Sequence, residues 1–205
     1  PERARDLQHV QQVKMSKIID FIKKEKLSVI FVIASFAICI SWSLYTNQIW
    51  EDFFITYRHS RNLIEGSGLV FTPGEKVHGF TSPLGVLLPA ICGLISGPRD
   101  YETAIWLFRL LFCIPAFTAG GILLMKCFRQ EGKDFPIPAV FAGILYLLEA
   151  KSVAFSLNGM ETSLMLFFLA WTFYIYRRGF SSHWVAAGIA WAGLMWTRPD
   201  SFIYV

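Results

Sequence analysis

The sequence has few charged side chains for its length. Only 17% of its 205 residues are charged, whereas a soluble domain carries about 25%. Hydrophobic residues make up 54% of the chain and aromatic residues 16%. This shortage of charge argues against an ordinary soluble domain and predicts an all-α polytopic membrane protein.

Cysteine is also scarce, and its spacing has no metal-binding pattern. The four cysteines lie in or at the ends of apolar segments, which favours small packing residues: Cys39, Cys92, Cys113 and Cys127. The formal net charge of +4 does not indicate a nucleic-acid partner. The cations stand at the ends of apolar runs rather than along one helix face.

The charge that is present is concentrated before the first apolar run. Residues 1–26 hold seven basic and four acidic side chains, too long a region for the start of a signal peptide. We expect residues 1–26 to be a cytoplasmic segment followed by an uncleaved membrane anchor, Leu27–Tyr45. Because the sequence starts without Met and stops inside an apolar segment, residues 27–205 are expected to be an incomplete transmembrane domain, the N-terminal fragment of a longer protein.

A short apolar run, Pro83–Gly97, decides the predicted topology. At about 1.5 Å per residue it covers roughly 22 Å, less than a hydrocarbon core of about 30 Å. If it lies in the outer interface, the basic clusters at 126–133 and 177–178 fall on the cytoplasmic side. Residues 48–102 then form one long outer loop with interfacial helices, and residues 151–161 and 198–200 also face outward. The remaining apolar runs are Thr103–Met125, Ile137–Leu157, Thr162–Tyr176 and Trp184–Thr197.

The predicted outer loop has clear local signals. Residues Glu51–Glu65 are expected to form a helix that the glycines of segment 66–68 end. Residues 69–71 are expected to form a short strand, and residues 72–75 a type II turn. Ser82 followed by Pro83 fits the N-cap and first position of the interfacial helix.

Two adjacent carboxylates, Glu51 and Asp52, open this loop just beyond the first span. Acids at a helix start also have an ordinary role, since they complement the helix dipole. The functional interpretation gains support from three cations in the same loop, Arg58, Arg61 and Lys76. A carboxylate can accept a proton, and cations can hold an anionic leaving group. Arg58 and Arg61 equally fit a solvated face or lipid headgroup binding.

Later segments add further candidates. Glu161 either starts a helix or belongs to the site, and Arg198 ends a short span where it can reach a cavity. Arg109 lies about 9 Å into its span, so it either snorkels outward or has a function. His59 and His78 lack a metal-ligand pattern and are interpreted as polar surface residues.

The loop sequence from Glu51 to Leu84, beginning Glu-Asp-Phe-Phe-Ile-Thr-Tyr-Arg-His, closely resembles the first outer loop of bacterial GT-C membrane glycosyltransferases. Its nearest recognised relatives are the mycobacterial-type terminal arabinofuranosyltransferases. Segments Gly159–Thr162 and Thr197–Asp200 resemble two later motifs of that group. The resemblance covers about residues 27–205.

This resemblance implies a GT-C-like helical bundle in the bacterial cell membrane. Its outer-face cavity would take a polyprenyl-phosphate sugar, and a base would activate the acceptor. The family usually has paired aspartates at the start of the loop, so Glu51 is a departure that leaves open whether it or Asp52 is the catalytic base. The donor phosphate and substrate would be bound by Arg58, Arg61, Lys76, Glu161 and Arg198. A divalent cation on Glu51 and Asp52 stays undecided.

The predicted function is therefore inverting transfer of a sugar from a polyprenyl-phosphate donor to a cell-envelope glycan, lipid or protein. Two alternatives remain from the sequence. Transporters and flippases tend to place ionisable residues in mid-membrane, where Arg109 is the main candidate. The second alternative is an envelope-assembly subunit without catalytic activity.

Overall fold

The computed structural model describes residues 25–75, 77, 79–129 and 137–204, so nearly all of the predicted cytoplasmic segment 1–26 lies outside the described residues. Within the described ranges the chain is helical and contains no strand, which confirms the all-α class. The α-helices are α2 Lys26–Thr46, α3 Glu51–Ile64, α4 Pro83–Ser96, α5 Tyr101–Phe108, α6 Ile114–Cys127, α7 Ile137–Leu148, α8 Ala150–Leu157, α9 Thr162–Arg178 and α10 Trp184–Thr197. A π-helical turn, η1 Arg109–Cys113, joins α5 to α6, and the 3₁₀ turns are η2 Phe180–Ser182 and η3 Pro199–Tyr204.

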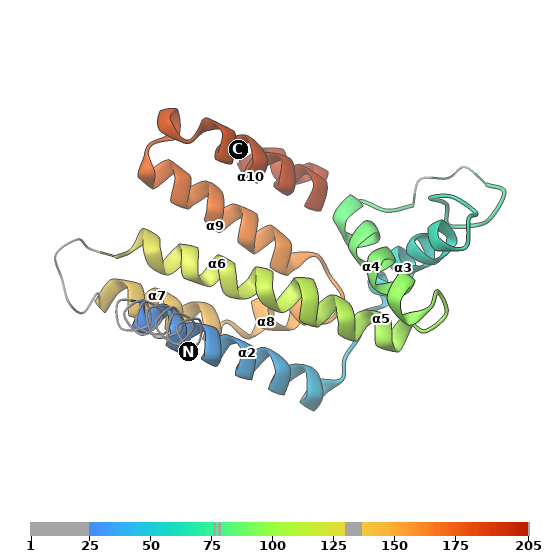
Figure 1. Ribbon diagram of the computed structural model, residues 1–205, viewed down its shortest axis with the longest axis horizontal. Helices are drawn as coiled ribbons and strands as arrows, with labels where there is room; N and C mark the ends of the chain where they lie inside the picture. The colour runs from blue at the N-terminus through green and yellow to red at the C-terminus, as the bar shows by residue number, and fades with distance from the viewer. Residues whose placement is uncertain (1–24, 76, 78, 130–136, 205) are drawn as a thin grey trace, which may run out of the picture.

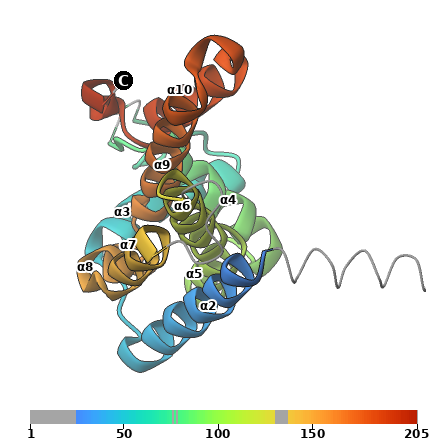
Figure 2. The same ribbon diagram turned by 90° about the vertical axis from the view of Figure 1, so that its left-hand side faces the viewer.

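The helices form a bundle with a separate group at one end. Helices α2, α6, α9 and α10 run roughly side by side, while α3 and α4 lie beyond the end of α6 that joins α5 (Figure 1). Helix α6 contacts α2, α7 and α9, and the view along the bundle shows it among them (Figure 2). The connection between α8 and α9 reaches the same end as α3 and α4.

Two described helical stretches are long and apolar enough to cross a membrane, Lys26–Thr46 and Tyr101–Cys127. A third span is possible if α7 and α8 count as one, although they meet at a bend of 57°. The continuous run expected for residues 137–157 is thus broken. The cause is Glu149, whose carboxylate accepts hydrogen bonds from the backbone N–H groups of Lys151 (3.3 Å) and Ser152 (2.5 Å) and starts a new helix.

Helix α4, the short apolar run, stays at the α3 end of the bundle and packs against α3 and α5 (Figure 1). Its predicted start is confirmed, because the Ser82 hydroxyl accepts a hydrogen bond from Gly85 N at 2.9 Å and Pro83 follows. The predicted turn at 72–75 is present, with Glu75 N donating to Thr72 O at 3.1 Å and Gly74 at φ 90°. Which side of a membrane this end faces stays a prediction.

The predicted strand at residues 69–71 is wrong. The carbonyls of Val70 and Phe71 accept hydrogen bonds from Asn62 Nδ2 at 2.8 and 2.9 Å. A side chain of α3 therefore satisfies the backbone acceptors that a neighbouring strand would otherwise pair with. The same two bonds hold the loop against α3.

Arg109 is buried in the bundle, with 1% of its surface exposed. Its Nε donates to Leu157 O at 2.5 Å and its Nη2 to Gln48 O at 2.7 Å. Of the two alternatives for Arg109, outward snorkelling is excluded, because the carbonyls of Leu157, at the end of α8, and of Gln48, between α2 and α3, accept its hydrogen bonds inside the protein. The turn at Arg109 is π-helical, and Pro115 explains this widening since its ring nitrogen cannot donate to the preceding turn.

The core around these contacts is apolar and joins both parts of the fold. It contains Phe53 from α3, Phe108 from α5 and Phe117 from α6. All four cysteines are buried and free, which confirms their interpretation as packing residues. The core thus fixes the start of α3 against the bundle.

Candidate functional site

The start of α3 is held by the connection between α8 and α9. Trp50 N donates to Asn158 O at 2.9 Å. Gly159 adopts φ +100°, and a Cβ added there would lie 2.7 Å from the Phe53 side chain. Only glycine fits both conditions without strain. These contacts bring two motifs that are far apart in the sequence into one site.

Glu161, at the end of this connection, is buried with 7% of its surface exposed. Its Oε1 lies 3.8 Å from Arg198 Nε, and Arg198 Nε lies 3.3 Å from Asp200 Oδ1. Burial raises the pKa of the Glu161 carboxyl, Arg198 opposes the rise, and the negative charges of Asp52 and Asp200 add to it. The bond from Trp50 N to Asn158 O brings the first turn of α3, with Asp52, to the connection that carries Glu161. A Cβ added at Gly85, in the first turn of α4, would lie 3.8 Å from Glu161 Oε2.

Glu51 and Asp52 occupy the first turn of α3, and both are exposed. The N-cap residue, Trp50, makes no side-chain capping bond. Across the described part of the chain, neither carboxylate makes a hydrogen bond or an ion pair with another side chain. Both can therefore accept a proton from a ligand.

Of the two arginines predicted to act beside the acid pair, Arg58 follows Glu51 by seven residues and so lies on the same face of α3 about two turns further along, whereas Arg61 lies on another face from Asp52. Because successive helical residues turn by about 100°, Arg61 points roughly opposite to Asp52. The two arginines line a cleft of about 400 Å³ bounded by α3 and the segment before α5. The Arg58 guanidinium lies 4.3 Å from the centre of the Phe71 ring.

His59 was expected to be a polar surface residue, and this is wrong. The side chain is fully buried, its Nδ1 lies 2.9 Å from Ile55 O, and its ring packs between Phe71 and Phe80. The folded loop covers it, which sequence spacing does not show. Lys76 and His78 lie outside the described residues.

A metal site receives limited support from the described residues. They contain no group of three or more His, Cys, Asp or Glu side chains placed to hold a metal ion. Glu51 and Asp52 alone supply few of the six or more oxygen ligands that Ca²⁺ or Mg²⁺ takes. These two side chains do not by themselves make a cation site.

Two charged residues near these sites were not among the predicted site residues. Asp200 pairs with Arg198, and Arg99 lines the arginine cleft. The signal for Asp200 was present in the Thr197–Asp200 motif. Arg99 had only a weak signal, the turn that follows a short apolar helix.

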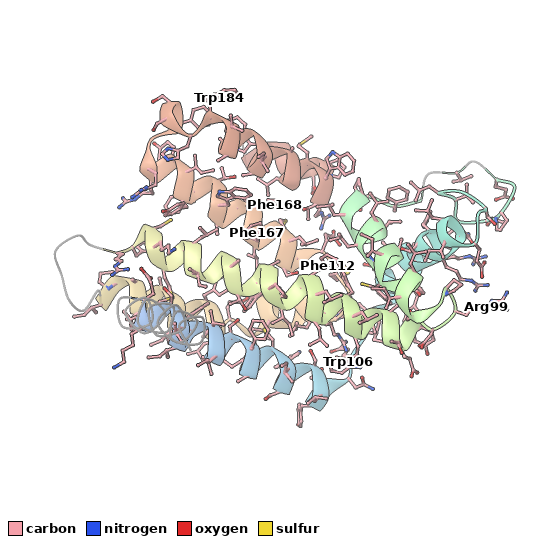
Figure 3. The ribbon with its side chains drawn as sticks, viewed as in Figure 1. Arg99, Trp106, Phe112, Phe167, Phe168 and Trp184 are labelled. Carbon is pink, nitrogen blue, oxygen red and sulfur yellow. The ribbon has the colours of Figure 1, made fainter. Side chains whose placement is uncertain are left out.

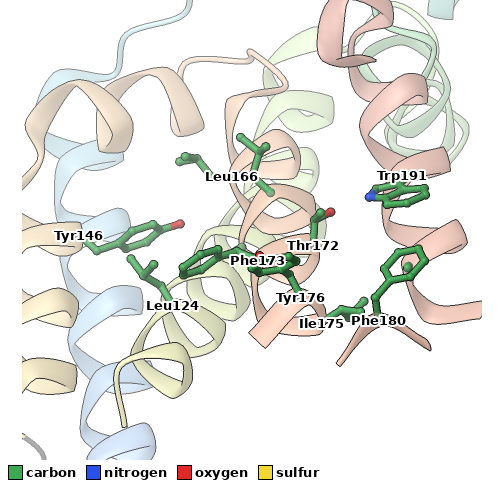
Figure 4. Close-up of a pocket in the computed structure, with 12 residues that line it drawn as sticks. Leu124, Tyr146, Leu166, Thr172, Phe173, Ile175, Tyr176, Phe180 and Trp191 are labelled. Atoms are coloured by element: carbon green, nitrogen blue, oxygen red, sulfur yellow. The ribbon is translucent and has the colours of Figure 1, made fainter. Parts of the chain in front are cut away.

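A larger cavity of about 640 Å³ lies among α6, α7, α9 and α10 (Figure 4). Apolar and aromatic side chains dominate its wall, including Phe173, Phe180 and Trp191. Among its described lining residues there is no Asp, Glu, His, Lys or Arg. Acid–base chemistry therefore fits the acids Asp52, Glu161 and Asp200 better than this cavity.

Comparison with known proteins gives two curated relatives. The chain is 24% identical over 178 residues to a terminal beta-(1→2)-arabinofuranosyltransferase of Mycobacterium tuberculosis, a match covering 84% of this chain and 26% of the relative. It is 31% identical over 130 residues to the protein of the same name in Corynebacterium glutamicum, covering 63% of this chain and 18% of the relative.

The chain spans about a quarter or less of the length of these relatives. No family model and no solved structure matches it. The similarity supports a relationship to glycosyltransferases named as terminal arabinofuranosyltransferases. It thus agrees with the resemblance carried by the outer-loop motif.

Proposed function

We propose that this chain belongs to an inverting glycosyltransferase that moves a sugar from a polyprenyl-phosphate donor to a cell-envelope glycan, lipid or protein. One observation carries the proposal. Glu161, Arg198 and Asp200 meet at one end of an apolar bundle, and the bond from Trp50 N to Asn158 O holds the first turn of α3, which carries Asp52, against the same connection. The two curated relatives named as arabinofuranosyltransferases support the glycosyltransferase class.

The proposed reaction is a single displacement at the anomeric carbon. The acceptor hydroxyl gives its proton to Asp52 or Glu51 while its oxygen bonds to the anomeric carbon. The bond from that carbon to the phosphate oxygen breaks, and polyprenyl phosphate leaves with both bonding electrons. Asp52 is the preferred candidate for the base because its residue type matches the paired aspartates of the family that the loop resembles.

Arg198 is the proposed partner of the departing phosphate. Its side chain is 42% exposed, and it pairs with Glu161 and Asp200. These acids fix its position, and its exposed surface stays available for an anion. Among the predicted phosphate-binding cations, Arg198 is the one placed beside the acids within the described residues, whereas Arg58 and Arg61 line the separate cleft.

The position of the cluster suits a lipid-linked donor. Such a donor cannot leave the bilayer, so its reacting phosphate must stay at the membrane surface. The cluster lies at the end of the bundle, beside the apolar helix α4 (Figure 1). The basic residues Arg177 and Arg178 lie at the far end of α9, which supports an outward-facing site in the bacterial cell membrane with a cytoplasmic N-terminus.

The transporter alternative loses its main support. Arg109 was the ionisable side chain deepest in a predicted span, yet it bonds to the carbonyls of Gln48 and Leu157. Two backbone oxygens thus hold this cation inside the bundle, while its Nη1 has no hydrogen-bond partner among the described residues. The acids at the bundle end thus fit chemistry at the surface.

The test is to incubate membranes containing the full-length gene product with a panel of labelled polyprenyl-phosphate sugars. We expect label to move to an envelope acceptor with one donor and to stay on the lipid when Asp52→Asn and Glu51→Gln are combined. The exposed variant Arg177→Gln is the matched control and should transfer normally. Failure of every donor, with the protein folded and inserted, would overturn the proposal.

A further inference from the structure

The arginine cleft is a second charged site that the proposed reaction does not use. Arg58, Arg61 and Arg99 line it against a single glutamate, Glu65. Arg61 Nε lies 3.1 Å and Arg99 Nε 3.4 Å from the same Glu65 oxygen. The side chains that line the cleft therefore carry three positive charges against one negative charge.

Two further acids, Asp100 and Glu102, lie near the cleft without lining it, and Glu102 Oε1 accepts a hydrogen bond from the Tyr101 hydroxyl at 3.4 Å. Asp100, which follows Arg99, caps α5 and accepts a hydrogen bond from Thr103 N at 3.0 Å. This bond lowers the pKa of the Asp100 carboxyl and turns it toward the helix start. Arg99 itself extends from the α3–α5 end of the molecule, and its side chain is 80% exposed (Figure 3).

The guanidinium groups are held in place before any ligand arrives. Arg58 stacks on the Phe71 ring, and Glu65 bridges Arg61 and Arg99. Arginine presents a planar set of donors that matches phosphate oxygens, and less entropy is lost when that set is already oriented. The cleft therefore fits an anion of phosphate type.

Apolar surface leads directly to the rim of the cleft. The last turns of α4 expose Ile91, Leu94 and Ile95, and the chain then passes through Pro98 to Arg99. Phe54 and Tyr101 form an exposed aromatic pair on the cleft wall, with ring centres 5.4 Å apart. Apolar side chains beside aromatic and cationic ones are the arrangement that lies at a membrane surface, at the level of the headgroups.

From this arrangement we infer that the cleft binds the phosphodiester headgroup of an anionic membrane lipid. This lipid is separate from the sugar donor, because Arg61 points roughly opposite to Asp52 on α3 and Arg58 lies about 10 Å along the helix from Glu51. The exposed end of α4 would enter the same leaflet. The site would fix the depth and tilt of α3, and with it the position of its first turn.

The experiment is native mass spectrometry of the full-length protein in neutral detergent, titrated with phosphatidylglycerol or phosphatidylcholine. We expect selective retention of phosphatidylglycerol, weakened by roughly fivefold for each arginine removed in Arg58→Gln and Arg99→Gln. The control pair Arg177→Gln and Arg178→Gln removes equal charge at the other end of the bundle and should retain the lipid.

Three results would overturn the inference. Unchanged retention in the double variant of Arg58 and Arg99 would show that the cleft is not the site. An equal loss in the control pair would show bulk electrostatic attraction only. Competition by glycerol phosphate as effective as the lipid itself would indicate a general anion site. The thermal unfolding midpoint of each variant checks folding, and the readout does not depend on sugar transfer.

Discussion

Glu161 and Arg198 form an ion pair, with Oε1 and Nε 3.8 Å apart, that joins the start of α9 to the end of α10. Glu161 is nearly buried whereas Arg198 is 42% exposed. One partner is thus fixed within the protein and the other faces outward. This pair holds an exposed cation at the end of the bundle, where the proposed reaction releases phosphate.

The acid pair gives the most direct prediction. Asp52→Asn or Glu51→Gln keeps the shape of the side chain but removes the proton acceptor. We expect the variant of the true base to lose transfer by about 10²–10⁴-fold, measured with labelled donor in membranes. Stability should change little, because the helix-dipole contribution is about 0.3–1 kcal/mol. Near-normal transfer in the double variant would reduce the pair to a helix start.

Glu161 predicts a pH dependence of stability. Its pKa is raised in the folded protein, so the folded state binds this proton more tightly than the unfolded state. Stability should therefore fall as the pH rises from about 4.5, the usual value, through the raised pKa. Unfolding midpoints of the wild type and of Glu161→Gln, measured across this range, should diverge with the variant losing less. Parallel curves would contradict the prediction.

Replacing the buried Arg109 should destabilise the folded protein. Arg109→Leu leaves the buried carbonyls of Gln48 and Leu157 without their donor, and we expect a destabilisation of about 2–5 kcal/mol. The matched control, Arg177→Leu, is exposed and should change stability by no more than about 0.5 kcal/mol. Chemical denaturation in detergent measures both. Equal effects would mean that the two bonds contribute nothing.

A side chain at Gly159 should clash with Phe53 next to the candidate site. In Gly159→Ala the new Cβ meets Phe53 at 2.7 Å and the backbone stays at φ +100°, which costs about 1–2 kcal/mol before any clash. We expect lower thermal stability and weaker transfer. Gly188→Ala is the control, because nothing lies within 4 Å of its added Cβ, and it should be neutral or slightly stabilising. A stable, active Gly159→Ala would show that the α8–α9 connection is not pressed against α3.

The topology is tested by cysteine labelling in a background without native cysteines. Glu75→Cys, in the loop after α3, should react with an impermeant reagent from outside the cell. Ser181→Cys, in η2 at the far end of the bundle, should react only after the membrane is opened. Both positions are exposed. Labelling of Ser181→Cys from outside would invert or break the proposed orientation.

Much of the local structure follows from the sequence. The apolar run after residue 26 predicted α2, and the glycines after Glu65 predicted the end of α3. Ser82 with Pro83 predicted the start of α4. Such signals act within a few residues, because apolar run length, caps and turn residues impose backbone geometry directly. The predicted strand at residues 69–71 did not form, because the Asn62 side chain of the preceding helix satisfies the carbonyls of that segment.

The arrangement of the site depends on contacts between distant segments. The sequence identified Asp52, Glu161 and Arg198 as candidates, but only helix packing brings them together. It also placed Arg61 with the acids, whereas the rotation of α3 turns that side chain toward a separate cleft. The sequence therefore determined which groups the chain carries and which segments are helical. The tertiary structure decided which groups meet, because their distances depend on how α3, α9 and α10 pack.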